Sequence, residues 1–175
     1  MRTRIELTRY MLDSAYTVMS DNLKGLTLAE ALFAPPGCYR SIIGTIKHAA
    51  AWGHVYRSYT FDAAPTPWCG LDWPHGLRDT VIKSEAYLAE LISWWNLSHQ
   101  LWLQDLGRAQ DEDLDQLRPV HWGATMPLFD IVRLIAHHHV YTPGKSTSCL
   151  PSAARNRGKS VRRWRRTISP PKVIK

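Results

Sequence analysis

The sequence has little cysteine, and the few cysteines that it has are far apart. Cys38, Cys69 and Cys149 are an odd number, and none belongs to a CxxC or a Cys/His finger spacing. This scarcity argues against a disulfide framework and against a structural zinc site. We therefore expect unpaired thiols in a reducing compartment, and a cytoplasmic protein.

Long hydrophobic runs are also missing. No run of about 18 or more apolar residues occurs, and residues 1–19 mix charges into their apolar positions instead of forming a signal-peptide core. The sequence thus predicts a protein that does not enter a membrane. With 175 residues, of which 45% are hydrophobic and 21% charged, the chain is long enough for one sizeable core and too short for two.

Acidic residues are absent from the last part of the chain. All 15 lie before residue 142, whereas residues 142–175 hold 10 of the 22 Lys and Arg residues. Residues 1–141 therefore carry 12 − 15 = −3, and the remaining +10 brings the net charge to +7. We expect a folded domain at 1–141 and an irregular, basic, disordered tail at 142–175.

Helical periodicity dominates the domain, and no convincing strand alternation competes with it. Apolar residues recur at helical spacing in four stretches, with a short helical turn at 26–32 between the first two. The four stretches are 4–23, 39–61, 77–106 and a last one from Thr125 into the histidines. The predicted fold class is all-α: a four-helix bundle with an irregular basic C-terminal tail.

The last predicted helix carries the most chemically suggestive residues, His137, His138 and His139. We expect it to begin with Thr125 as the N-cap and Pro127 in its first turn. His138 continues the apolar stripe, while His137 and His139 are rotated about 100° to either side. These two are predicted to be flank or surface residues. The stripe consists of Leu128, Ile131 and Ile135.

A metal site is one interpretation of this pattern. His48 lies on the face of the second helix that carries Trp52, whereas His54 is rotated about 120° from it. One histidine from this helix and an i, i+4 pair from the last helix would give three imidazoles and an open coordination position. The chain supplies His48 and His138 but has Thr142 at the third position. Histidines that are hydrogen-bonded within the core are the alternative.

Two stretches, SIIGTIKHAAAWGHVYRSY at 41–59 and HWGATMPLFDIVRLIAHHHVY at 121–141, resemble the DinB family, also called the DinB/YfiT-like family. The resemblance implies an up-down-down-up bundle, often dimeric, that binds a divalent metal such as Zn or Ni. It implies His48 and His138 as metal ligands, with Thr142 in the place of the third. It also implies a metal-dependent hydrolase or thiol transferase, with a small-molecule or thiol substrate and a second copy of the chain as partner.

The chain departs from the family pattern immediately after Tyr141. The family continues with histidine, a small residue, Gly and then Glu or Gln, whereas this chain has Thr142, Pro143 and Gly144. A proline inside a helix costs about 3 kcal/mol, so we expect the helix to break there. Read one nucleotide earlier, the codons of residues 142–147 can encode His-Thr-Gly-Glu-Ile-Asn. We therefore hypothesise a frameshift that removed the third ligand and impaired metal binding.

The tail leaves other interpretations open. Residues 159–166 form a basic cluster around Trp164, which could contact phosphates or an anionic surface. No helix-turn-helix, RNA-binding or zinc-finger pattern accompanies it. We therefore rank the interpretations of the tail as an out-of-frame end first, inert disorder second, and an arm that binds nucleic acid or a membrane third. A metal-dependent enzyme, a noncatalytic dimerising bundle and a nucleic-acid binder are thus the three classes of function considered.

Overall fold

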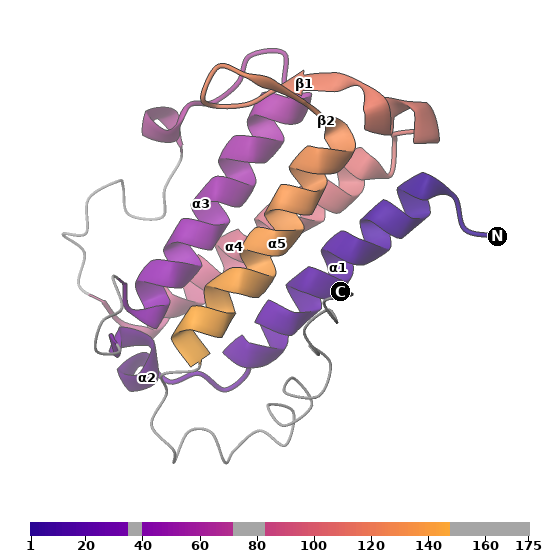
Figure 1. The fold of residues 1–175 in the computed structure, drawn as a ribbon. Helices are drawn as coiled ribbons and strands as arrows, with labels where there is room; N and C mark the ends of the chain where they lie inside the picture. The colour runs from indigo at the N-terminus through magenta and orange to yellow at the C-terminus, as the bar shows by residue number, and fades with distance from the viewer. Residues whose placement is uncertain (35–39, 72–82, 148–175) are drawn as a thin grey trace, which may run out of the picture.

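The computed structural model describes residues 1–34, 40–71 and 83–147, with side chains up to Val140. Helices α1, α3, α4 and α5 form an up-down-down-up bundle, in which the parallel helices α3 and α4 are joined by a long crossover (Figure 1). The predicted all-α fold class is therefore confirmed. The helices are α1 Arg4–Leu23, α2 Leu28–Leu32, α3 Ile42–Phe61, α4 Glu85–Leu106 and α5 Leu128–Thr147, with short 3-10 turns η1 Trp68–Gly70 and η2 Asp111–Asp115.

Hydroxyl side chains fix where the helices begin. The Thr3 side chain accepts a hydrogen bond from the Glu6 amide while the Glu6 carboxylate accepts one from the Thr3 amide, and α1 has the predicted bounds. Ser84 accepts a bond from the Tyr87 amide in the same way. Helix α4 therefore begins at Glu85 and not near Leu77 as predicted, while residues 77–82 lie outside the described part of the chain.

A β-hairpin replaces the predicted start of the last helix. Strand β1, Leu117–Pro119, pairs antiparallel with β2, Thr125–Pro127, and α5 starts directly after it. The interpretation of Thr125 as an N-cap and of Pro127 as a first-turn residue was wrong. Gly123 in the connecting turn has a φ of +84°, which glycine adopts without a steric penalty, so the chain can reverse here.

Helix α5 continues to Thr147, whereas the sequence predicts a break at Pro143. A proline removes one amide hydrogen bond, and helices frequently bend at such a position instead of ending there. The boundary between helix and tail is thus later than 141/142, and the predicted disorder of residues 148–175 lies outside the described residues. Cys69 is a free, exposed thiol, as expected; Cys38 and Cys149 are not among the described residues.

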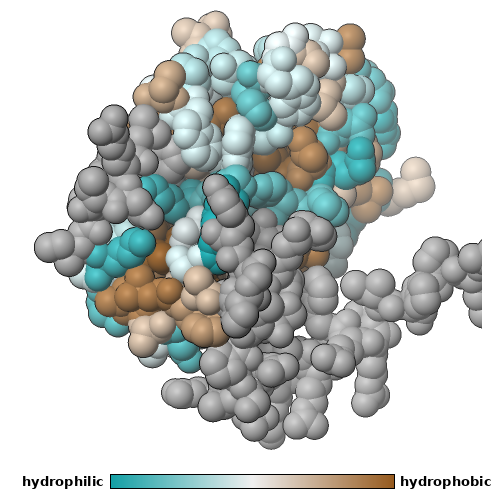
Figure 2. All heavy atoms as spheres, turned by 60° about the vertical axis from the view of Figure 1, so that its left-hand side comes forward, coloured by the Kyte–Doolittle hydropathy of each residue, from teal (hydrophilic) through white to brown (hydrophobic). Residues whose placement is uncertain are grey.

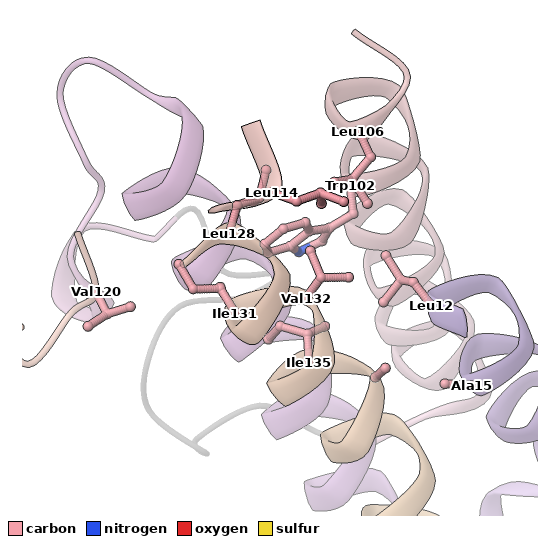
Figure 3. Close-up of a cluster of buried hydrophobic side chains, with 11 residues drawn as sticks. Leu12, Ala15, Trp102, Leu106, Leu114, Val120, Leu128, Ile131, Val132 and Ile135 are labelled. Atoms are coloured by element: carbon pink, nitrogen blue, oxygen red, sulfur yellow. The ribbon is translucent and has the colours of Figure 1, made fainter. Parts of the chain in front are cut away.

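Two hydrophobic clusters fill the bundle. The first lies toward the hairpin, where Trp102 of α4 packs beside Leu114 and against side chains of α5 (Figure 3). The second lies toward α2 and is centred on Trp95. Leu12, Leu106, Leu128, Ile131, Val132 and Ile135 belong to the first cluster, and Met19, Ile42, Ile46, Leu88 and Leu91 to the second.

Helices α3 and α4 approach each other very closely at Gly53. A Cβ atom built on Gly53 would collide with the Ser98 hydroxyl, so only a glycine fits this contact without a shift. The indole N–H of Trp102 donates to the Gly53 carbonyl at 2.9 Å, and the Arg57 guanidinium pairs with the buried Asp105 carboxylate at 2.7 Å. Glycine, indole and ion pair together fix α3 against α4.

The outer surface of the bundle is mixed. On the side of α3, brown hydrophobic patches are set among teal and white residues (Figure 2). Within the described ranges, no helix combines the length and the apolar character that crossing a membrane requires.

Candidate functional site

The structure brings two of the predicted site residues together. The rings of His48, on α3, and His138, on α5, lie side by side with their centroids 5.1 Å apart and their planes inclined by 38°. The backbone of residue 142 belongs to α5, one turn after His138, but the side chain of Thr142 lies outside the described residues. We call His48 and His138 the outer pair.

Both imidazoles of the outer pair are held in the neutral form. Burial first, then the Arg40 guanidinium and the His138 ring, lower the pKa of His48 to about 4. Burial also lowers the pKa of His138, with smaller contributions from Arg40 and His137. Each ring therefore offers one nitrogen lone pair at neutral pH, and that is the form in which histidine binds a metal ion.

The lone pair of His48 has a partner within the protein. The indole Nε1 of Trp52, four residues later on α3, donates a hydrogen bond to His48 Nδ1 at 3.1 Å. The two rings meet edge to face, with centroids 6.0 Å apart. The sequence placed Trp52 on the same helix face as His48, but spacing alone does not reveal this bond.

An aromatic cluster adjoins the outer pair on the hairpin side. It consists of Trp52, Tyr56, Trp68, His121 and Trp122, from α3, η1 and the hairpin turn. The ring centroid of Trp52 lies 4.6 Å from that of Trp68 and 4.4 Å from that of His121, and the centroids of His121 and Trp122 are 4.7 Å apart. The contact of His121 with Trp52 was not predicted from the sequence, because it depends on the unpredicted hairpin.

A second pair of histidines, His99 and His139, which we call the inner pair, lies at an adjacent face of α5, about 100° around the helix from His138. The ring of His99, on α4, stacks on Tyr16 at 3.8 Å, and His99 Nε2 lies 3.1 Å from the Asp13 carboxylate of α1. His139 is only 3% exposed and meets the edge of Trp95 at 5.9 Å. Burial, followed by His138 and His99, lowers the pKa of His139 to about 3.

The placement of His139 corrects the sequence-based prediction, which put it on the flank or surface. Helix α5 packs against α1 as well as α3, so its buried face is wider than the single stripe that leads to His138. Val132, Ala136 and His139 follow one another at helical spacing, and the first two are also buried. That second stripe was the signal that could have identified His139. His137 is exposed, as predicted.

The outer pair matches the chemistry of a divalent-metal site only in part. Neutral imidazoles suit zinc and nickel. However, within the described ranges no group of three or more His, Cys, Asp or Glu side chains could hold a metal ion. The assignment of His48, His138 and Thr142 as metal ligands stays a prediction.

A bundle of this topology, in which a histidine of α3 meets a histidine of α5, defines the class of the protein. The chain belongs to the DinB superfamily, whose sequence model matches residues 11–141. Its fold is similar to the crystal structure of a conserved protein from Enterococcus faecalis, with a TM-score of 0.61 and 18% sequence identity over 85% of this chain and 96% of that one. No curated protein matches the sequence.

Proposed function

We propose that the outer pair is a divalent-metal site of the DinB type, weakened in this chain, and that the associated activity is that of a metal-dependent hydrolase or thiol transferase. The observation that carries the proposal is the 5.1 Å separation of two imidazoles from different helices. Their lowered pKa values support it as well, because protons then compete little with a metal ion at neutral pH.

A divalent ion held by this pair would act as a Lewis acid toward a water or a thiol. His48 and His138 would supply the nitrogen ligands, and the Thr142 hydroxyl a weak third ligand at most. Arg40 brings a positive charge close enough to both rings to lower their pKa values. This charge disfavours a cation and favours an anionic group on the substrate.

We also propose, from the resemblance to the family, that the active form is a homodimer in the cytoplasm and that its substrate is a small molecule or a low-molecular-weight thiol. The frameshift explains the third position, since Thr142 stands one helical turn after His138, where an imidazole would complete the site.

The test is the affinity for Zn²⁺ and Ni²⁺ of the natural chain and of a Thr142→His variant, measured by competition with a chromophoric chelator. We expect the variant to bind one ion per chain at least about tenfold more tightly, which corresponds to about 1.4 kcal/mol. Thr147→His is the matched control, because it adds a histidine on the opposite face of α5, nine residues after His138. In the Thr142→His background, His48→Gln should abolish the gain.

A noncatalytic bundle is the second candidate function. It is favoured by the hydrogen bond from Trp52, which already satisfies His48 without a metal ion. If neither the natural chain nor Thr142→His binds an ion, the metal proposal fails and the histidines of the outer pair are structural residues. Equal binding by Thr142→His and Thr147→His would also contradict the assignment of position 142.

A further inference from the structure

We propose that Trp52 is an internal competitor for the metal ion: its indole N–H occupies the one lone pair through which His48 could bind a cation. The inference rests on the proposed function, since it concerns access to the same site. It assigns to Trp52 a positioning role, in which the residue acts on the ion only through His48.

The hydrogen bond between the two rings fixes which nitrogen of His48 carries the proton. An indole nitrogen is a donor only, so His48 Nδ1 must be the acceptor of the 3.1 Å bond. A neutral imidazole has one N–H and one lone pair, which places the proton of His48 on Nε2. Neither nitrogen is then open to a cation, since Nε2 carries the proton and Nδ1 accepts the indole N–H.

Metal binding through either nitrogen therefore breaks the same bond. An ion at Nδ1 replaces the indole directly. An ion at Nε2 requires the proton to move to Nδ1, where it would face the N–H of Trp52. In both cases Trp52 must turn away from His48 before or while the ion binds.

The surroundings of Trp52 determine what this movement disturbs. Its ring is in contact with Trp68, with His121 at 4.4 Å and with Tyr56 at 5.7 Å. A rotation away from His48 consequently shifts the aromatic cluster between α3 and the hairpin. The NMR signal of the Trp52 indole N–H should therefore report metal binding without an activity assay.

The size of the effect follows from the strength of one hydrogen bond. A neutral bond of this kind contributes on the order of 1 kcal/mol, which corresponds to about a fivefold change in affinity. Trp52→Phe removes the N–H and keeps an aromatic ring in the cluster. Trp122→Phe is the matched control, because it removes an indole from the same cluster at a residue that contacts Tyr56 and His121 and not His48.

The experiment has two parts. First, nitrogen-15 NMR of the metal-free natural chain determines which nitrogen of His48 carries the proton. Second, Zn²⁺ and Ni²⁺ affinities are measured for the natural chain, Trp52→Phe and Trp122→Phe, and again in the Thr142→His background. We expect the proton of metal-free His48 on Nε2. The metal affinity should be about fivefold higher for Trp52→Phe in at least one background and unchanged for Trp122→Phe. When the ion binds, the Trp52 indole signal should move from its metal-free position.

Three results would overturn the inference. A proton on Nδ1 of metal-free His48 excludes the bond on which it depends. Equal affinities with and without Trp52→Phe in both backgrounds, with the ion bound, refute the competition but leave the metal site standing. Absence of binding in every variant removes the proposed function and the competition together, and thereby differs from the second result.

Discussion

His138 and His139 are consecutive residues of α5, yet they lie in opposite environments. His138 meets His48 in the half-buried outer pair, next to the aromatic cluster. His139 lies in the inner pair, buried and in contact with Trp95 of α4. One step along a helix rotates a side chain by about 100°, so a helix that packs on two sides can present one histidine to a ligand and bury the next. Adjacent identical residues of one helix can therefore have separate roles.

The charges near the two pairs also differ in sign. Arg40 lowers the pKa values of His48 and His138. Asp13 acts in the other direction on His99, although burial has the larger effect and the pKa of His99 is lowered overall. The outer pair is thus more positive in its surroundings than the inner pair, and only the outer pair has the neutral, accessible rings that a ligand site requires.

The largest loss of stability is expected when the side chain that packs against the inner pair is removed. Trp95 is 1% exposed, stacks on Tyr16 at 4.5 Å and touches His139. We expect Trp95→Ala to lower the free energy of unfolding by about 3–5 kcal/mol, because it leaves a cavity in the core. Trp122→Ala, at a half-exposed position, should change it by less than about 1 kcal/mol. Urea denaturation measures both, and similar losses would contradict the division into a buried and an accessible side.

Buried histidines should make the fold sensitive to acid, and His139 of the inner pair should contribute over the widest pH range, beside His48 with its pKa of about 4. His139 has a pKa near 6.5 in the unfolded chain and of about 3 in the folded one. Between these values only the unfolded chain binds the proton, so stability falls as the pH decreases from about 6.5 toward 3, by up to about 1.4 kcal/mol per pH unit for this one group. His99, His138 and Asp13 are the nearest titratable groups that modify this slope.

Replacement of His139 tests this assignment. His139→Leu should reduce the loss of stability between pH 6.5 and 4.5, measured by urea denaturation at each pH, whereas the exposed His137→Gln should keep the natural slope. An unchanged slope in His139→Leu would mean that other groups cause the acid sensitivity.

The smallest effects are expected when the charged neighbours of the two pairs, Asp13 and Arg40, are neutralised. Asp13→Asn should lower the pKa of His99, and Arg40→Gln should raise that of His48, because the removed charges have opposite signs. Stability near pH 7 should change by at most about 1 kcal/mol in each variant, since both charges are largely open to solvent. NMR titration of the two rings measures the shifts, and shifts of the same sign would contradict the contrast in charge.

Much of the fold could be predicted from the sequence where local signals act alone. The bounds of α1 follow from a capping box at its start and a glycine after its end, and these are local features. The hairpin was missed because its strands are only three residues each, too short for an alternating pattern. Thr125 and Pro127 also fit the start of a helix, and only their pairing with β1, which the sequence does not show, decides the matter.

The sequence predicted that His48 and His138 meet, but it did not predict the contacts of the side chains around them. His48 and His138 lie on helix faces that the apolar pattern directs inward, so their meeting followed from the bundle. The contacts of His121 with Trp52 and of His99 with Asp13 join residues far apart in the chain. His99 continues the buried stripe of α4 between Trp95 and Trp102, but the stripe does not identify its partner. Long-range contacts of this kind depend on the exact rotation of each helix.

The close contact at Gly53 has a consequence for how the molecule can move. Because α3 and α4 are in close contact at Gly53 and Ser98 and are joined by the Trp102 and Arg57 interactions, they are expected to act as one rigid body. His48 belongs to that body, whereas His138 belongs to α5. Any change in the distance between the rings of His48 and His138 is therefore a displacement of α5 relative to the α3–α4 unit. The hinge for such a displacement would lie at the hairpin that leads into Leu128.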